Sequence, residues 1–142
     1  MANVLVVEDN SALGDLLNTF ISAAGHQVTL CAQSIRALES IRDRTWDLVV
    51  TDMFMPDRDG LDILRETRRL SPDTPVIAMS GGSTLLPSFD PLMCARELGA
   101  AAVLKKPFTR SELLREVNFA LSSRRAPERS AGTKTSLLQA VS

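Results

Sequence analysis

The sequence predicts an α/β protein in which five parallel strands alternate with five helices. Short apolar segments rich in Val and Leu recur along the chain, at residues 4–7, 27–31, 48–51, 76–79 and 101–104. Several are apolar at consecutive positions, which is typical of strands buried on both faces of a sheet. Regular alternation of such strands with helices favours a parallel sheet with right-handed crossovers and a helix layer on each face.

The first segment between strands has the spacing of an amphipathic helix. Apolar residues follow one another at i, i+3, i+4, i+7 and i+8: Leu13, Leu16, Leu17, Phe20, Ile21 and Ala24. We expect this helix to begin near Asn10 or Ser11, whose side chains favour helix starts, and to close at Gly25.

Shorter apolar stripes predict the remaining helices. The second is expected behind a Ser34 cap, the third after Gly60, and the fourth ends at Gly99. Their apolar positions are Ile35, Leu38 and Ile41, then Leu61 and Leu64, then the segment 92–98, and last Leu113, Leu114, Val117 and Leu121. Residues 81–91 are predicted to be a loop because of their Gly, Ser and Pro content.

Length and composition indicate one ordinary globular domain. The chain has 142 residues, with 44% hydrophobic and 23% charged residues, which excludes typical disordered and membrane-protein compositions. No signal peptide and no membrane-spanning run is recognised. Cys31 and Cys94 are isolated thiols, so we expect neither a disulfide nor a metal site, and a reducing cytoplasm fits best.

Charge separates a domain at residues 1–122 from a basic tail at residues 123–142, expected to be disordered. Residues 122–142 carry a net charge of +3, from Arg124, Arg125, Arg129 and Lys134 against Glu128, and the first 121 residues therefore carry −4. Phosphate backbones are bound by clustered Lys and Arg, so an acidic domain makes nucleic acid an unfavourable partner.

Five polar residues fall at the ends of predicted strands. Glu8 and Asp9 follow the first strand, Asp52 the third, Ser80 the fourth and Lys106 closely follows the fifth. In parallel sheets of this kind, ligands bind outside the carboxyl ends of the strands. Each feature alone has an ordinary explanation, as a helix cap, a solvated loop or a strand exit. Their occurrence together, in order, predicts a functional site at this edge.

The three carboxylates favour a divalent metal ion. Glu8, Asp9 and Asp52 would repel one another unless a cation neutralised them. Oxygen ligands without neighbouring His or Cys favour Mg²⁺, which also accepts phosphate oxygens. A carboxylate beside this ion can attack phosphorus, while Lys106 and the Ser80 hydroxyl bind the phosphoryl oxygens. The pattern therefore indicates phosphoryl transfer.

At this point the sequence resembles the receiver domain of two-component response regulators over roughly residues 3–121. The matching segments are residues 4–9 (VLVVED), 52–60 (DMFMPDRDG), 76–80 (VIAMS) and 106–108 (KPF). The resemblance implies a flavodoxin-like, doubly wound three-layer sandwich with five parallel strands in the order 2-1-3-4-5. It also implies that Asp52 is the phosphoacceptor, and that Glu8, Asp9, Asp52 and the backbone carbonyl of Phe54 hold Mg²⁺.

The resemblance assigns further roles at the end of the sheet and also shows two departures. Ser80 corresponds to the switch hydroxyl, Lys106 to the phosphate-binding lysine, and a cis peptide is expected before Pro107. The family usually has Tyr or Phe where this sequence has Val103, so the aromatic half of the usual switch is missing. The stretch between Ser80 and Lys106 is also a few residues longer than usual.

The leading hypothesis is a stand-alone, cytoplasmic response regulator that is no enzyme beyond its own phosphorylation and dephosphorylation. It would take a phosphoryl group from a histidine kinase or histidine phosphotransfer protein and act on a downstream protein as a monomer or weak homodimer. Nucleic acid and membrane are not expected partners. One alternative is a degenerate receiver that only binds proteins. The other is a Mg²⁺-dependent phosphatase of the haloacid dehalogenase class, disfavoured because Phe54 stands where that class has its general acid.

Overall fold

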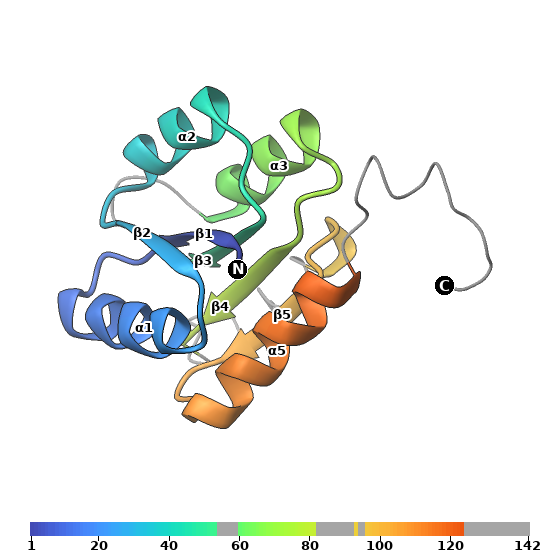
Figure 1. Cartoon of the computed structure of the whole chain (residues 1–142). Helices are drawn as coiled ribbons and strands as arrows, with labels where there is room; N and C mark the ends of the chain where they lie inside the picture. The colour runs from blue at the N-terminus through green and yellow to red at the C-terminus, as the bar shows by residue number, and fades with distance from the viewer. Residues whose placement is uncertain (54–59, 82–92, 94–95, 124–142) are drawn as a thin grey trace.

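Five parallel strands form a single sheet in the computed structural model, which describes residues 1–53, 60–81, 93 and 96–123 (Figure 1). The strand order is β2-β1-β3-β4-β5, which confirms the predicted topology. The strands are β1 (Asn3–Val7), β2 (Gln27–Cys31), β3 (Leu48–Asp52), β4 (Val76–Ser80) and β5 (Ala102–Lys105). The chain begins near the centre of the sheet, moves to one edge at β2 and returns to β3. The order therefore reverses between β1 and β3, where α/β proteins of this type place their ligands.

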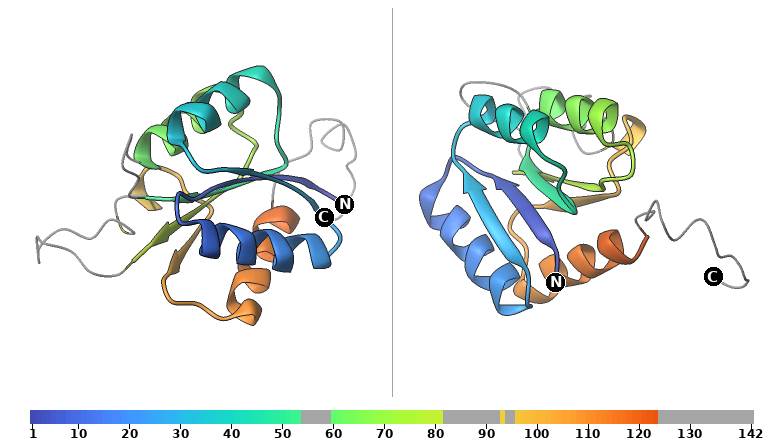
Figure 2. Two further views of the ribbon diagram at one scale, coloured as in Figure 1. Left: turned by 90° about the vertical axis from the view of Figure 1, so that its left-hand side faces the viewer. Right: turned by 45° about the horizontal axis from the view of Figure 1, so that its top comes forward.

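Two helices cover each face of the sheet in the described part of the chain. The helices α1 (Ser11–Ala23) and α5 (Arg110–Ser123) lie on one face, and α2 (Ser34–Asp43) and α3 (Gly60–Leu70) on the other (Figures 1 and 2). Every residue of β3 and β4 is buried, which explains why residues 48–50 and 76–79 are apolar without interruption.

Successive residues of β1 enter two separate hydrophobic cores. Val4 and Val6 pack into the cluster that contains Leu17 and Ile21 of α1, whereas Leu5 and Val7 join the cluster on the α2 and α3 side. The side chains of a strand point alternately to opposite faces, so a strand covered on both faces needs an apolar residue at every position. The three-layer arrangement follows from this requirement.

The first helix begins and ends as the sequence predicts. Asn10 is its N-cap, and the side-chain oxygen of Asn10 accepts a hydrogen bond of 2.9 Å from the N–H of Leu13. Beyond the helix, Gly25 has φ = 100°, a left-handed conformation that glycine adopts without steric cost.

The expected cap of the second helix is wrong. The N-cap is Gln33, whose side chain makes no capping hydrogen bond, and Ser34 is the first helical residue. Ser34 is buried together with Ala37, Leu38 and Ile41, whereas Ile35 is 45% exposed. The buried residues follow the i, i+3, i+4 and i+7 spacing of one helix face, and Ile35 lies outside that face.

The other boundaries differ little from those expected. Strands β3 and β4 each extend one residue further, so that Asp52 and Ser80 are their last residues. Helix α5 runs to Ser123, one residue into the predicted tail. Of the expected helix at residues 92–98, Met93, Arg96 and Glu97 are helical, and residues 92, 94 and 95 lie outside the described residues. Residues 82–91 of the expected loop and the rest of the tail also lie outside them.

Trp46 closes the end of the sheet at which β3 begins. Its side chain is buried, its indole N–H donates a hydrogen bond of 3.1 Å to the carbonyl of Ser40, and the guanidinium of Arg44 lies 4.2 Å from its ring centroid. The hydroxyl of Thr74 donates a bond of 2.8 Å to the Trp46 carbonyl. These contacts tie the start of β3 to α2 and to the turn before β4.

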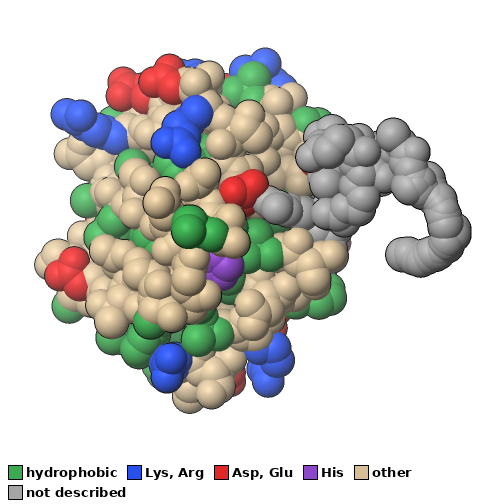
Figure 3. Space-filling model, viewed as in Figure 1, with side chains coloured by type: hydrophobic (Ala, Val, Ile, Leu, Met, Phe, Trp, Pro, Cys, Tyr) green, Lys and Arg blue, Asp and Glu red, His purple; other side chains and the backbone are tan. Residues whose placement is uncertain are grey.

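The surface in Figure 3 carries side chains of both charges. Acidic and basic groups are scattered over this face without a continuous patch of either sign among the described residues. None of the helices in the described ranges is long and apolar enough to span a bilayer.

Candidate functional site

The carboxyl ends of the strands are aligned by hydrogen bonds that continue the sheet beyond the strands. The N–H of Glu8 donates to the carbonyl of Cys31 at 3.0 Å, and the N–H of Lys106 donates to the carbonyl of Ser80 at 2.7 Å. Residues that directly follow β1 and β5 are thereby held to the ends of β2 and β4. Main-chain hydrogen bonds thus help to bring the polar residues of distant segments to one edge.

Three acidic side chains converge at this edge. Carboxylate oxygens of Glu8, Asp9 and Asp52 all lie within 4.8 Å of one another. Glu8 and Asp52 are buried, with 2% and 6% of their surface exposed, whereas Asp9 is exposed. The cluster therefore has two carboxylates inside the protein and one at its opening to solvent.

Lys106 connects the two buried carboxylates. Its Nζ lies 2.9 Å from Oε1 of Glu8 and 3.3 Å from Oδ2 of Asp52, with 22% of the side chain exposed. Burial opposes the charge of Lys106, but the hydrogen bond to Glu8 and the charges of Asp52 and Glu8 outweigh it, so the pKa of Lys106 is raised. The ammonium group is therefore fixed in its charged form beside Asp52.

The environment of Glu8 opposes its ionisation. Burial is the largest effect and raises the pKa of Glu8, and the charge of Asp52 acts in the same direction. The hydrogen bond from Lys106 and one of 3.1 Å from the N–H of Asn10 to Oε2 partly offset this. Both oxygens of Glu8 thus have a partner within the protein.

Three of the remaining predicted residues, Ser80, Val103 and Pro107, lie in the described part of the chain. Ser80 is buried at the end of β4, and the peptide bond between Lys106 and Pro107 is cis. Val103 is partly buried and packs against the hydrophobic cluster on the α2 and α3 side. Phe54, whose carbonyl was expected to bind metal, lies outside the described residues.

Two residues that the sequence analysis gave no role contact the main chain of Asp52. The hydroxyl of Thr51 donates a hydrogen bond of 3.0 Å to the carbonyl of Asp52. Gly60, at the start of α3, approaches the same carbonyl so closely that a side chain there would overlap it. Gly60 belongs to the 52–60 motif, so its presence was visible in the sequence, but its contact was not.

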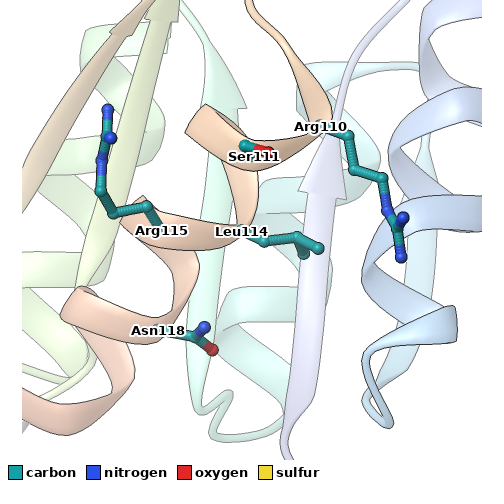
Figure 4. Close-up of a pocket in the computed structure, with 5 residues that line it drawn as sticks. All are labelled: Arg110, Ser111, Leu114, Arg115 and Asn118. Atoms are coloured by element: carbon teal, nitrogen blue, oxygen red, sulfur yellow. The ribbon is translucent and has the colours of Figure 1, made fainter.

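A second concave feature lies on α5, away from the acidic cluster. It is lined by Arg110, Ser111, Leu114, Arg115 and Asn118 (Figure 4). The side chains of Arg110 and Arg115 extend to opposite sides, and the guanidinium of Arg110 lies 5.8 Å from the ring centroid of Phe20 on α1. The two cations do not converge on one point, so the acidic cluster is the better candidate for a functional site.

Comparison with known proteins agrees with this geometry. The family model for the response regulator receiver domain matches residues 4–118, which extend from β1 into α5. The chain belongs to the response regulator receiver domain family. Its fold is thus that of a receiver domain.

Relatives of this receiver domain include larger regulators. It is 33% identical over 126 residues to the DNA-binding transcriptional regulator NtrC of Azospirillum brasilense, covering 89% of this chain and 25% of that protein. It is also 33% identical over 125 residues to the response regulator MprA of Mycobacterium sp. (strain KMS), covering 88% of this chain and 52% of that protein. The chain therefore spans between a quarter and about half of these relatives.

Solved structures of receiver domains match nearly their whole length. The receiver domain protein from Clostridium thermocellum has a TM-score of 0.78 at 31% identity, covering 86% of this chain and 95% of that chain. The receiver domain of a sensor histidine kinase from Pseudomonas aeruginosa PAO1 has a TM-score of 0.75 at 27% identity, covering 86% of this chain and 98% of that chain. The latter contains a magnesium ion coordinated in its active-site cleft.

Proposed function

We propose that this receiver domain accepts a phosphoryl group on Asp52 from a phosphohistidine donor, a histidine kinase or a histidine phosphotransfer protein. The observation that carries the proposal is the placement of Lys106 Nζ between Glu8 and Asp52, 2.9 and 3.3 Å from their oxygens, within the acidic cluster. An ammonium group at this point stabilises negative charge that accumulates on and around Asp52 during phosphoryl transfer.

In the proposed reaction, a carboxylate oxygen of Asp52 attacks the phosphorus atom of the donor. An oxygen–phosphorus bond forms and the phosphorus–nitrogen bond of phosphohistidine breaks, with its electron pair remaining on the imidazole. Lys106 donates to a phosphoryl oxygen and offsets its charge, and Ser80 supplies a further hydrogen bond. Hydrolysis of the aspartyl phosphate returns the free carboxylate. In this proposal the chain catalyses only its own phosphorylation and dephosphorylation.

The donor set at this edge fits Mg²⁺. Glu8, Asp9 and Asp52 present only carboxylate oxygens, within 4.8 Å of one another, and Asp9 is exposed to solvent. When bound, Mg²⁺ supplies positive charge that offsets the repulsion between the carboxylates and an incoming phosphoryl group. Asp9 and Asp52 would hold it directly. Glu8, whose oxygens are engaged by Lys106 and Asn10, would act by orienting its neighbours.

Phosphate incorporation tests the proposal. The protein is incubated with Mg²⁺ and acetyl phosphate or phosphoramidate, and its intact mass is measured. We expect one phosphoryl group on the wild-type protein and none on Asp52→Asn, since an amide cannot act as the nucleophile.

An Asp→Asn change away from the site is the matched control. Asp15→Asn alters an exposed residue of α1 and is expected to leave incorporation unchanged. Equal incorporation into Asp52→Asn and the wild type would show that Asp52 is not the acceptor. No incorporation into the wild type would instead favour a receiver that only binds proteins.

A further inference from the structure

Gly60 lies against the main chain of the proposed phosphoacceptor. A Cβ atom added to Gly60 would overlap the carbonyl oxygen of Asp52 and lie 2.7 Å from the Cα of Met53, closer than the 3.0 Å that Cβ contacts respect. The N–H of Gly60 also donates a hydrogen bond of 2.9 Å to the carbonyl of Met53. The first residue of α3 is thus docked directly on the end of β3.

Neither side of this contact can move away freely. On α3, the next turn carries Ile63 and Leu64, both fully buried in the hydrophobic core. At the end of β3, the N–H of Met53 is held by a bond of 2.8 Å to the carbonyl of Met79 on β4. Interiors this densely packed resist displacement of even one methyl group. A side chain at position 60 would therefore shift the peptide between Asp52 and Met53.

The same carbonyl is also held by Thr51. Its hydroxyl donates a hydrogen bond of 3.0 Å to the Asp52 carbonyl oxygen. The carbonyl carbon and the Cβ of Asp52 are bonded to the same Cα, so a shift of this peptide that displaces the Cα also displaces the carboxylate, whose oxygen lies 3.3 Å from Lys106 Nζ. The position of the nucleophile thus depends on the main chain behind it.

We propose that Gly60 is a positioning residue for phosphorylation, which fixes the peptide after Asp52 together with the Thr51 hydroxyl. The inference rests on the proposed function, because it concerns how Asp52 is aimed for that reaction. The other glycines in the described part of the chain lack this contact: at Gly14, for example, a Cβ would meet only the flexible side chain of Leu30, at 3.1 Å. Gly60 contacts the backbone of the reacting residue itself.

The test compares Gly60→Ala with Gly14→Ala. Initial rates of phosphorylation by acetyl phosphate with Mg²⁺ are measured at equal concentrations of folded protein, determined by circular dichroism. A misplacement of about 1 Å can cost on the order of 100-fold in rate, so we expect Gly60→Ala to be slower by about 10- to 100-fold. The ¹³C shift of the Asp52 carbonyl, recorded without metal, should also move in Gly60→Ala. Gly14→Ala should match the wild type in both measurements.

A role in stability alone would change neither measurement for the folded molecules. A folded Gly60→Ala protein with wild-type rate, or with an unchanged Asp52 carbonyl shift, overturns the inference. If Gly60→Ala does not fold, Thr51→Val provides the test, since it removes the hydroxyl without adding volume. A phosphorylation rate below that of the wild type supports positioning of the Asp52 carbonyl, and a wild-type rate overturns the inference. If the wild-type protein itself gains no phosphoryl group, the proposed function fails before any variant is compared, and the inference fails with it.

Discussion

The ammonium nitrogen of Lys106 lies nearer to Glu8, at 2.9 Å, than to Asp52, at 3.3 Å. Glu8 is almost fully buried, and burial raises its pKa, so Lys106 is what chiefly compensates the charge of this carboxylate. The lysine therefore has two tasks. It stabilises a buried acid in the resting domain, and in the proposed reaction it donates a hydrogen bond to the phosphoryl group carried by Asp52.

Removing Lys106 should destabilise the metal-free domain. We expect Lys106→Met to lower the free energy of unfolding by about 1–3 kcal/mol, because it leaves the Glu8 carboxylate buried with one partner fewer. Urea unfolding without Mg²⁺, followed by circular dichroism, measures this change. Lys105→Met, which alters the exposed neighbour, is the control and should have little effect. The double variant Glu8→Gln with Lys106→Met should recover part of the lost stability. No recovery would show that the unpaired Glu8 carboxylate is not the cause of the destabilisation.

Metal affinity should depend more on Asp9 than on Glu8. Both oxygens of Glu8 are already hydrogen-bonded, one to Lys106 and one to the N–H of Asn10, whereas Asp9 is exposed. We expect Glu8→Gln to weaken Mg²⁺ binding on the order of tenfold and Asp9→Asn to weaken it further. Isothermal titration calorimetry with Mg²⁺ compares the two variants. A larger loss of Mg²⁺ affinity for Glu8→Gln than for Asp9→Asn would mean that Glu8 gives up its bond to Lys106 and binds the ion directly.

Stability should fall on mild acidification because of His26. Burial lowers the pKa of His26 below its ordinary 6.5, and the N-terminal amine acts in the same direction, while Asp47 opposes them. The neutral ring accepts a hydrogen bond of 3.1 Å at Nδ1 from the N–H of Ala2. Between the folded pKa and about 6.5 the unfolded chain binds more protons, so stability is full above about pH 6.5 and declines as the pH falls through that window.

Urea unfolding between pH 5.5 and 7.5 measures this decline, and His26→Gln should flatten it. His26 is the only histidine of the chain, so its NMR titration assigns the folded pKa without ambiguity. A folded pKa above 6.5 would contradict the expected direction.

Switching should involve Ser80 without participation of position 103. Ser80 ends β4, immediately beside the site, whereas Val103 packs against the hydrophobic cluster on the α2 and α3 side and has no long side chain to reorient. We expect beryllofluoride with Mg²⁺ to shift the amide resonances of Ser80 and Gly81 strongly and that of Val103 weakly. Ser80→Ala should reduce the shift at Gly81. A dominant change at Val103 would locate the switch in β5.

The sequence predicted the sheet well because β1, β3 and β4 are covered on both faces, and most positions of such strands require apolar residues. The rule that ligands bind outside the carboxyl ends of parallel strands likewise predicted that Glu8 and Asp52 lie at one edge of the sheet. It could not show that Lys106 lies closer to Glu8, since that depends on side-chain conformations in three dimensions. The contact of Gly60 with Asp52 joins positions eight residues apart in the sequence, and no hydrophobic periodicity relates the two positions.

One local feature was readable and was missed. At the start of α5, the hydroxyl of Thr109 accepts a bond of 3.1 Å from the N–H of Glu112, and Oε1 of Glu112 accepts one of 2.8 Å from the N–H of Thr109. This is a capping box, which Thr followed three positions later by Glu announces in sequence. By contrast, the polar Ser34 suggested a cap that the helix does not use, since Ser34 is the first helical residue and is buried.

The single tryptophan of the chain has a consequence for spectroscopy. Trp46 precedes β3, whereas Asp52 ends it, so the indole and the acidic cluster lie at opposite ends of one strand. Its indole N–H donates to the Ser40 carbonyl, and the Arg44 guanidinium lies over its ring. Intrinsic fluorescence therefore reports loss of the packed start of β3, and ligands at the far end of the strand should leave emission largely unchanged. Unfolding can thus be followed by tryptophan fluorescence while the site is titrated with ligand. Ligand binding should not disturb the fluorescence, because the indole and the site lie at opposite ends of β3.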